Sequence, residues 1–358
     1  MDRRKLLRRC RNVAGGACLA LCLGCAVSAG LGDSLPGEAV LFQPGGTPVF
    51  SIQGRAPAGE EPAPLLTVGS GSVPVHPLEL PQAPALSPAP SPDPDRPTAP
   101  VEEITLDGGA PVAGFFVKDT SGTGLDLAEE LTLPPDVSPA GDGRVEILIY
   151  HTHTHEAYST EYTGSYYTDM ETRTQDPDRS VVAAGETLKE ALEARGYGVI
   201  HDATVCDDQF NGSYSRSWEV LQRNLEEYPD IQVTIDVHRD SMTTGDGVKY
   251  KPTTVIAGEK TAQCMLLAGS DLYEEWGDFP DWEENLRLIL RLQQAATEKY
   301  PTLLRPLDFS DCKYNMNATT GSMLVEIGTE VTTVAEARRA AALLGDALAD
   351  VLDDLKAE

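Results

Sequence analysis

Prolines are concentrated in one stretch of the chain, and this concentration limits where regular structure can form. Thirteen of the 26 prolines lie between Arg55 and Pro100. Because proline lacks a main-chain donor and favours extended polyproline geometry, we expect a Pro-rich disordered tether over residues 34–110. Residues 111–358 then remain for one folded domain, which is long enough to bury a sizeable core.

The first 33 residues have the features of an export or anchor segment. Six basic residues within Arg3–Arg11 precede the uncharged apolar run Val13–Leu31. At ~1.5 Å per residue this run reaches about 29 Å, enough to cross a hydrocarbon core with its basic end in the cytoplasm. We therefore predict a single-pass transmembrane anchor; a signal peptide cleaved near Val27–Ala29 and a lipoprotein site at Cys25 are the alternatives. All three place the domain outside the cytoplasm.

The chain is strongly acidic, with 56 Asp and Glu against 28 Lys and Arg and a formal net charge of −28. The excess of acid lies in the body, because the first 33 residues carry six bases and only two acids. An acidic body would repel a phosphate backbone, whereas nucleic-acid binding depends on Lys and Arg. DNA or RNA binding is therefore not expected.

Strand-like and helix-like segments alternate after residue 111. Continuous Val, Ile and Leu runs predict strands, and apolar residues at three- and four-residue spacing predict helices. The expected strands are 114–117, 145–150, 197–200, 231–237, 253–257, 265–268 and 323–327, and the expected helices are 180–195, 217–228, 282–299 and 334–355. This order predicts an α/β fold with a mostly parallel sheet and helices on both faces.

Histidines follow two of the predicted strands at the point where each strand ends. The strand 145–150 runs into three histidines and a glutamate, and the strand 231–237 runs into His238. The first group comprises His151, His153, His155 and Glu156. Functional groups gather at the carboxyl ends of strands in open α/β sheets, and imidazole with carboxylate suits Zn²⁺. The pattern therefore favours a catalytic zinc site with three protein ligands over packed or exposed histidines.

The residues of the first group cannot all bind one ion. If the strand continues, alternate side chains share a face, and His151, His153 and His155 point the same way. A turn at this place would instead bring Glu156 together with His153 or with His151. The sequence leaves these arrangements open.

Glu326 is an acid inside an otherwise apolar predicted strand, Met323–Ile327. Burying a carboxylate there costs free energy unless the group is paired, metal-bound or protonated. A solvent-facing position on an edge strand is the alternative. Because Val and Ile flank the acid, we favour a general base with a raised pKa that takes a proton from a metal-bound water.

Four segments together resemble one protein family. They are Ile149–His153 with Glu156, Asn211–Arg216, Asp236–Asp240 and Leu324–Gly328. In their order and spacing they resemble the stage II sporulation protein P family, membrane-anchored peptidoglycan hydrolases of endospore-forming bacteria. The resemblance covers roughly residue 111 to the C-terminus, and the N-terminal anchor and Pro-rich spacer agree with the layout of that family.

The resemblance implies a fold and a ligand set similar to those of the zinc-dependent N-acetylmuramoyl-L-alanine amidases. Carried over, His238 matches the second histidine ligand, and the first falls in the pair of His151 and His153. The carboxylate ligand falls on Glu156. In the broader amidases this ligand lies further along, just before the first helix, where this chain has the acids of Asp176–Asp178.

The resemblance also implies roles in catalysis and substrate binding. Glu326 would transfer the proton of the attacking water to the leaving amine, while zinc polarises the amide carbonyl. Arg239 would stabilise the oxyanion or hold a stem-peptide carboxylate, or else pair with Asp240. Tyr214 and Arg216 would line the substrate groove, or their loop would cap the helix that follows.

The resemblance implies a hydrolase that cleaves the amide between N-acetylmuramic acid and the stem peptide, with stem-peptide cross-links as a further target in the family. The family acts in engulfment with other proteins, notably a lytic transglycosylase and a multispanning membrane protein. A non-catalytic cell-wall-binding or scaffold protein on the same fold is the main alternative. A metal-dependent peptidase or deacetylase is another.

Overall fold

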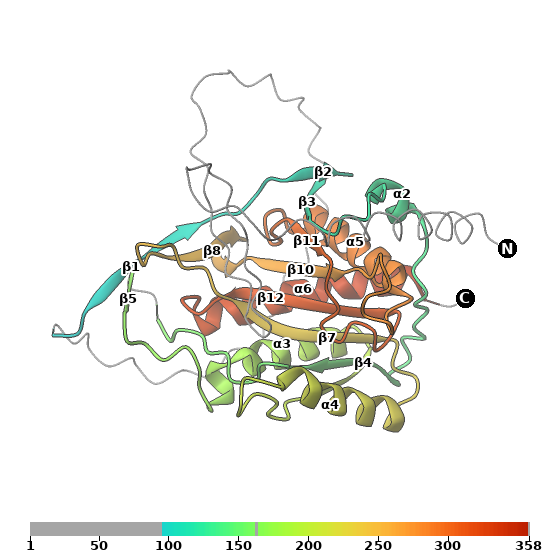
Figure 1. Ribbon diagram of the computed structural model, residues 1–358, viewed down its shortest axis with the longest axis horizontal. Coiled ribbons are helices and arrows are strands. Elements are labelled where there is room, and N and C mark those ends of the chain that lie inside the picture. Colours follow the sequence, from blue (N-terminus) through green and yellow to red (C-terminus); the bar gives the residue numbers. More distant parts are fainter. Residues whose placement is uncertain (1–94, 162–163, 357–358) are drawn as a thin grey trace, which may run out of the picture. The chain divides into compact units, whose positions relative to one another are not determined.

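Eight strands form the central sheet. The computed structural model describes residues 95–161 and 164–356, and Figure 1 shows the sheet with its helices. In sheet order the strands are β2 (Ala110–Val112), β3 (Phe115–Asp119), β11 (Leu307–Ser310), β10 (Cys264–Gly269), β12 (Gly321–Thr329), β7 (Val233–Asp240), β4 (Val145–Tyr150) and β6 (Gly198–Asp202). Five of the seven pairings are parallel, which confirms the predicted mostly parallel sheet.

The direction of the strands changes once in the middle of the sheet. β12, β7, β4 and β6 run parallel to one another, whereas β10 pairs antiparallel with β12. The carboxyl ends of β12, β7 and β4 therefore lie at the same edge. In an open α/β sheet this is the edge where functional groups gather.

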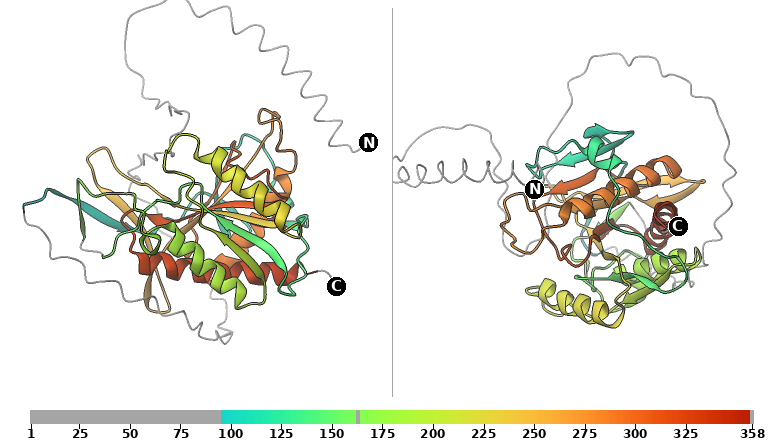
Figure 2. Two further views of the ribbon diagram at one scale, coloured as in Figure 1. Left: turned by 90° about the horizontal axis from the view of Figure 1, so that it is seen from below. Right: turned by 90° about the vertical axis from the view of Figure 1, so that its right-hand side faces the viewer.

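Helices cover both faces of the sheet, as predicted. They are α2 (Leu127–Thr132), α3 (Val181–Glu193), α4 (Ser213–Glu227), α5 (Trp282–Lys299) and α6 (Val334–Asp354), with a short 3-10 helix η1 (Pro177–Arg179) before α3. Side chains of β4 alternate between the faces: Ile147 and Ile149 pack in the main core with α3, α5 and α6, whereas Leu148 and Tyr150 pack with Leu221 of α4. Figure 2 shows α4 on one side of the strands and α3 with α6 on the other.

Local sequence sets the helix boundaries. Ser180 caps α3 by accepting a main-chain hydrogen bond, and Thr333 with Glu336 forms a capping box at the start of α6. These two helices lie within two residues of their predicted bounds. α4 begins earlier than predicted, at Ser213, because Gly212 has a left-handed φ of 82° and starts the helix without a side-chain cap.

Of a second, four-stranded sheet, only β8 (Lys249–Ile256) is among the predicted strands, expected at 253–257. The order of this sheet is β5 (Ser165–Tyr167), β1 (Thr98–Ile104), β8 and β9 (Glu259–Ala262). β1 lies inside the predicted tether 34–110, so the boundary has to be corrected: folded structure is present from residue 98, not 111. Proline density falls after Pro100, Val101 is buried, and β1 pairs with both β5 and β8. Pairing with remote strands therefore overrides the local composition.

The predicted anchor at residues 1–33 and the tether up to residue 94 lie outside the described residues. Within the ranges that the structure describes, no helix combines the length and the apolar character needed to span a bilayer. The anchor and the earlier part of the tether therefore remain predictions from sequence.

Candidate active site

His153 and His238 come together at the carboxyl edge of the sheet. β4 and β7 are neighbouring parallel strands with Tyr150 opposite Asp236, so residues at the end of each strand reach the same place. The imidazole centroids of His153 and His238 lie 5.3 Å apart at an interplanar angle of 80°, and both residues are 3% exposed. The structure thus brings one member of each histidine group into contact.

The chain turns after His153, and the turn brings Glu156 beside His238. The Glu156 amide donates to the His153 carbonyl at 3.1 Å, so the strand does not continue. Glu156 Oε2 lies 3.5 Å from His238 Nδ1 and accepts a hydrogen bond from the Arg239 amide at 3.0 Å. Burial alone would raise the pKa of Glu156, but the hydrogen bond and charge of His238 lower it to about 2. We call His153, Glu156 and His238 the His–Glu–His cluster.

His238 lies between two carboxylates, those of Glu156 and Asp236. Its Nε2 is 3.0 Å from Asp236 Oδ1, and Asp236 also accepts hydrogen bonds from the amide and hydroxyl of Thr152, at 2.8 and 2.6 Å. Burial alone would lower the pKa of His238, but Asp236 and Glu156 raise it well above its ordinary value. Sequence reasoning missed Asp236, although it carries the same signal as Glu326, an acid within an apolar strand.

Three polar atoms at this site are buried and have no hydrogen-bond partner within the described residues. They are His153 Nδ1, His238 Nε2 and Glu326 Oε2. The approach of His238 Nε2 to Asp236 is short but lacks the angle of a hydrogen bond. Unpaired buried polar atoms are rare in proteins and mark positions where a ligand or ion can be bound. In the described parts of the chain, no three His, Cys, Asp or Glu side chains already surround a common ion position.

Glu326 on β12 faces the same cluster. It lies opposite His238 in the parallel pair of β7 and β12, so both side chains project from one face of the sheet. The side chain is only partly exposed, and burial and the nearby charge of Asp240 raise the pKa of Glu326 to about 8. A carboxyl group with such a pKa can exchange a proton near neutral pH.

His151 makes different contacts from His153. Its Nδ1 lies 2.8 Å from the Val237 carbonyl oxygen, and its Nε2 lies 2.8 Å from His201 Nε2. Both ring nitrogens are therefore engaged, and burial lowers the pKa of His151 to about 3. Of the two histidines that the sequence leaves open, His153 is the one that joins Glu156.

Helix α3 approaches the pair of His151 and His201 at Gly185. A Cβ on Gly185 would lie 2.7 Å from His201 Nε2 and 2.8 Å from His151 Nε2. Gly185→Ala is therefore expected to lower the free energy of unfolding by about 1–3 kcal/mol, although the same change stabilises an open helix position. Chemical denaturation measures the change, with Ser215→Ala at an exposed position of α4 as the control. Unchanged or increased stability of Gly185→Ala would contradict this close packing.

Arg239 is buried, and its guanidinium contacts main-chain oxygens. It donates to the carbonyls of Ala157, Thr172 and Asp240 at 3.1, 2.8 and 3.2 Å. These bonds tie the segment after the His–Glu–His cluster to the end of β7. The catalytic role of Arg239 stays a prediction, and the contacts seen in the structure are positioning ones.

Tyr214 and Arg216 lie near the start of α4 and make different contacts. The Tyr214 ring meets the edge of His153 at 5.8 Å between centroids. Arg216 instead donates to carbonyls of the loop before α4, those of Cys206, Gln209 and Asn211. Tyr214 thus borders the cluster, whereas Arg216 holds the preceding loop in place.

Two further aromatic residues border the site and were not found by sequence reasoning. Phe210 stacks on His153 with 4.7 Å between centroids and 6° between planes, and Tyr314 packs on Tyr214 at 5.3 Å. Tyr314 and Asn315 both have left-handed backbone conformations, with φ of 42° and 59°. Aromatic residues in loops carry no distinctive sequence signal, so only the contacts identify them.

Asp176 and Asp178 lie at η1, away from the cluster. Asp176 accepts a hydrogen bond from the Asp178 amide at 3.1 Å, and Asp178 forms an ion pair with Arg338 at 3.4 Å. Both acids are exposed, whereas Glu156 is 5% exposed and contacts His238. The geometry therefore favours Glu156 as the carboxylate of the cluster.

Comparison with solved structures gives only distant similarity, to two amidases. The CwlD amidase from Clostridioides difficile, in complex with the GerS lipoprotein, is 12% identical with a TM-score of 0.34, covering 58% of this chain and 99% of that one. An N-acetylmuramoyl-L-alanine amidase of Nostoc punctiforme is 11% identical with a TM-score of 0.33, covering 60% and 97%. The α/β assignment therefore stands on the strand order of this chain itself.

Sequence comparison agrees with the resemblance carried by the motifs. The stage II sporulation protein P of Bacillus subtilis is 28% identical over 234 residues, which cover 62% of this chain and 53% of that protein. The chain thus spans about half the length of this curated relative. The family model of stage II sporulation protein P matches residues 119–349, which is more than half of the chain. The chain belongs to the stage II sporulation protein P family.

Proposed function

We propose that this protein is a peptidoglycan hydrolase that cleaves the amide between N-acetylmuramic acid and the stem peptide during sporulation. Membership of the stage II sporulation protein P family supports a role in sporulation. The observation that carries the proposal is the convergence of the His–Glu–His cluster with Glu326 of the adjacent strand. Two imidazoles, an ionised carboxylate and a carboxyl group of raised pKa are the parts that a metal-assisted hydrolase requires.

The donor set of the cluster fits Zn²⁺. Imidazole nitrogens and a carboxylate oxygen are ligands that zinc prefers, and three protein ligands leave a position for water. His153 Nδ1 is buried without a hydrogen-bond partner within the described residues, and Glu156, which is held ionised, lies beside His238 Nδ1. We propose that His153, Glu156 and His238 would hold the ion, which when bound would supply an activated water and polarise the amide carbonyl.

The other residues of the site have roles that follow from their contacts. Glu326 takes a proton from water and returns it to the leaving nitrogen, for which a pKa raised to about 8 is suited. Arg239 holds Glu156 through its amide and so acts as a positioning residue. Phe210 and Tyr214 pack on His153 and keep water away from that ring.

We further propose that the domain works outside the cytoplasm, held by a single-pass membrane anchor or, alternatively, secreted after cleavage of the N-terminal segment. The basic cluster and apolar run of the first 33 residues support both. Peptidoglycan is the proposed substrate. A lytic transglycosylase and a multispanning membrane protein are the proposed partners in engulfment.

Hydrolysis of purified peptidoglycan by the full-length protein tests this function. With zinc present, we expect muropeptides with new L-alanine amino termini, loss of their release on chelation, and recovery when zinc is returned. Cut cross-links would identify an endopeptidase, and released acetate a deacetylase. A zinc-loaded protein that binds the cell wall but releases no muropeptides would instead favour a scaffold function. Hydrolysis that is unaffected by chelators would contradict the metal proposal.

A further inference from the structure

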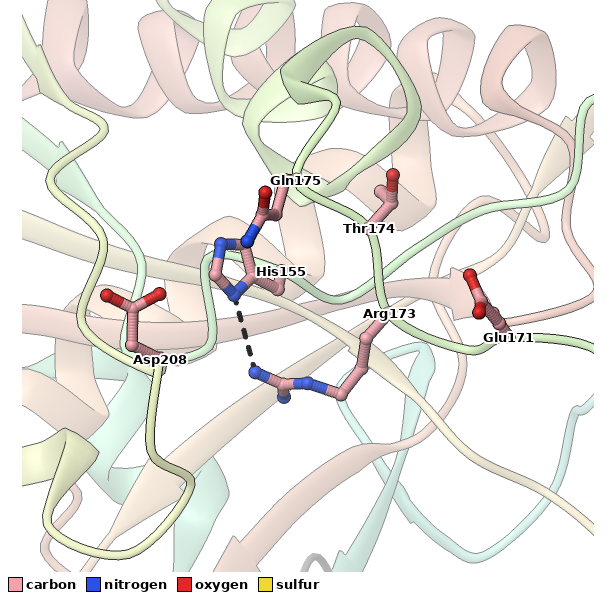
Figure 3. Close-up of a pocket in the computed structure, with 6 residues that line it drawn as sticks. All are labelled: His155, Glu171, Arg173, Thr174, Gln175 and Asp208. Atoms are coloured by element: carbon pink, nitrogen blue, oxygen red, sulfur yellow. Dashed lines mark hydrogen bonds between the residues drawn. The ribbon is translucent and has the colours of Figure 1, made fainter.

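A pocket lies beside the His–Glu–His cluster. Its volume is about 400 Å³. The lining residues, drawn in Figure 3, are His155, Glu171, Arg173, Thr174, Gln175 and Asp208. His155 is the chain neighbour of Glu156, and Arg173 forms an isolated β-bridge with Glu156. Because both contacts involve a residue of the cluster, the pocket is next to the place of the proposed reaction.

Asp208, another lining residue of the pocket, is also close in sequence to a residue that contacts the cluster. Asp208 precedes Phe210 by two residues, and the Phe210 ring stacks on His153. A ligand in the pocket is therefore bordered by the same loop that covers His153. The loop that contains Asp208 and Phe210 thus borders both the pocket and His153.

Asp207 fixes the two nitrogen donors of this pocket. Its side chain is fully buried and lies 2.8 Å from Arg173 Nη2 and 3.2 Å from His155 Nδ1. The carboxylate also accepts the His155 amide at 3.3 Å. Within the described residues, the contacts of the Arg173 guanidinium all use Nη2, and its side chain is 40% exposed. Asp207 therefore fixes the orientation of the guanidinium, and Nε and Nη1, which point to different sides of it, remain as single donors for a ligand.

Carboxylates complete the lining of the pocket. Asp208 and Glu171 are both exposed, and Asp208 has no hydrogen-bond or ion-pair partner among the described residues. Figure 3 shows these two acids on opposite sides of the group formed by His155, Arg173 and Gln175. Arginine donors beside free carboxylates match a ligand that carries both an anionic and a cationic group.

We infer that this pocket binds a zwitterionic side chain of the stem peptide, one with a carboxylate and an ammonium on the same carbon, as in meso-diaminopimelate. Arg173 binds the carboxylate with His155 as a further donor, and Asp208 binds the ammonium. In an extended stem peptide the side-chain zwitterion of the third residue lies roughly 15 Å from the cut amide, because the γ-linked glutamate and the four side-chain bonds of diaminopimelate add to the main-chain length. That reach includes a pocket lined by the chain neighbour of Glu156 and by its β-bridge partner Arg173. The inference rests on the proposed function and names the part of the substrate that is selected.

Binding of two free tripeptides to the full-length, zinc-loaded protein tests the inference. The probes are L-Ala-γ-D-Glu-meso-diaminopimelate and L-Ala-γ-D-Glu-L-Lys, and neither contains the amide that the enzyme would cut. Isothermal titration is expected to give at least about tenfold tighter binding of the diaminopimelate peptide, because lysine lacks the side-chain carboxylate. Equal affinities would overturn the inference.

Variants of the lining residues sharpen this test. Arg173→Gln is expected to remove the difference between the two tripeptides, and Arg173→Lys to restore part of it, since lysine keeps the positive charge but places its donors differently. Asp208→Asn is expected to weaken both tripeptides several-fold, because both side chains carry the ammonium. Arg179→Gln, at an exposed arginine of η1, is the matched control and is expected to change neither affinity. A loss of equal size for both tripeptides in Arg173→Gln would contradict the inference.

The readout separates this inference from the proposed function. Tripeptide binding needs no turnover, so the pocket can discriminate in a protein that fails to hydrolyse peptidoglycan. Conversely, hydrolysis without discrimination between the tripeptides would leave the hydrolase proposal standing and remove the pocket from it. If Arg173→Gln has a lowered melting temperature, Asp208→Asn, at an exposed position, still tests the inference. Unchanged tripeptide affinity in Asp208→Asn would count against it.

Discussion

The Glu326→Gln variant is expected to release muropeptides about 100 to 10,000 times more slowly than the unchanged protein while keeping its fold. Glutamine has the size of glutamate but cannot take a proton from water, and positioned acid–base groups contribute rate factors of this order. Chromatography of muropeptides released from purified peptidoglycan under zinc saturation measures the effect. Glu298→Gln, at an exposed position of α5, is the matched control and is expected to keep full activity.

The same substitution has an expected signature in stability that does not depend on catalysis. In the metal-free protein the pKa of Glu326 is raised to about 8 from its ordinary 4.5, so folding favours the protonated form. The stability linked to this proton is fully present below pH 4.5 and is lost as the pH rises through 8. Glu326→Gln should therefore melt above the unchanged protein at pH 9 and close to it at pH 5. A lower melting temperature of the variant at pH 9 would contradict the raised pKa.

His153→Ala and His151→Ala are expected to differ sharply in zinc binding. His153 carries a buried nitrogen without a hydrogen-bond partner within the described residues and contacts His238. Replacing a residue that only orients a metal ligand lowers metal affinity about 10–100-fold. Replacing a ligand itself, as in His153→Ala, should therefore lower zinc affinity by more than about 100-fold. His151 is engaged with Val237 and His201, so its replacement should leave zinc stoichiometry unchanged.

Competition with a fluorescent chelator measures these affinities on full-length protein. His151→Ala is expected to lower the free energy of unfolding, because it removes a buried hydrogen-bonded ring, and the melting temperature reports this separately from zinc. His238→Ala should behave as His153→Ala does. Tight zinc binding by His153→Ala together with loss in His151→Ala would reverse the ligand assignment.

Segments with a continuous apolar run or with apolar residues at helical spacing could be predicted closely from sequence. Helix α5 and strand β4 have their predicted bounds, because each buries residues whose spacing is visible within the segment itself. β5 and β9 have three and four residues, which are too few for the two-residue alternation of a strand to be recognised in the sequence. β1 depends on its pairing with β8, which is remote in the chain, and its one proline, Pro100, argues against a strand.

The residues of the site were predictable where one residue type stands out from its surroundings. Glu326 interrupts an apolar predicted strand, and His238 directly follows another, so both residues can be identified from the sequence alone. The choice between His151 and His153 depends on where the chain turns, and the turn is fixed by the Glu156 amide bonding to the His153 carbonyl. Such a contact forms only in the folded chain, so the sequence could not decide it.

Strand β1 is where the chain enters the folded domain, and its place in the small sheet has a mechanical consequence. It lies between β5 and β8: its first three residues, Thr98–Pro100, pair antiparallel with β5, and its last four, Val101–Ile104, pair parallel with β8. A pull on the chain before residue 98 along the strand would load these bonds in shear, all at once, rather than unzip them one by one. Tension applied before residue 98 would thus be borne first by the small sheet, ahead of the larger sheet that carries the proposed site.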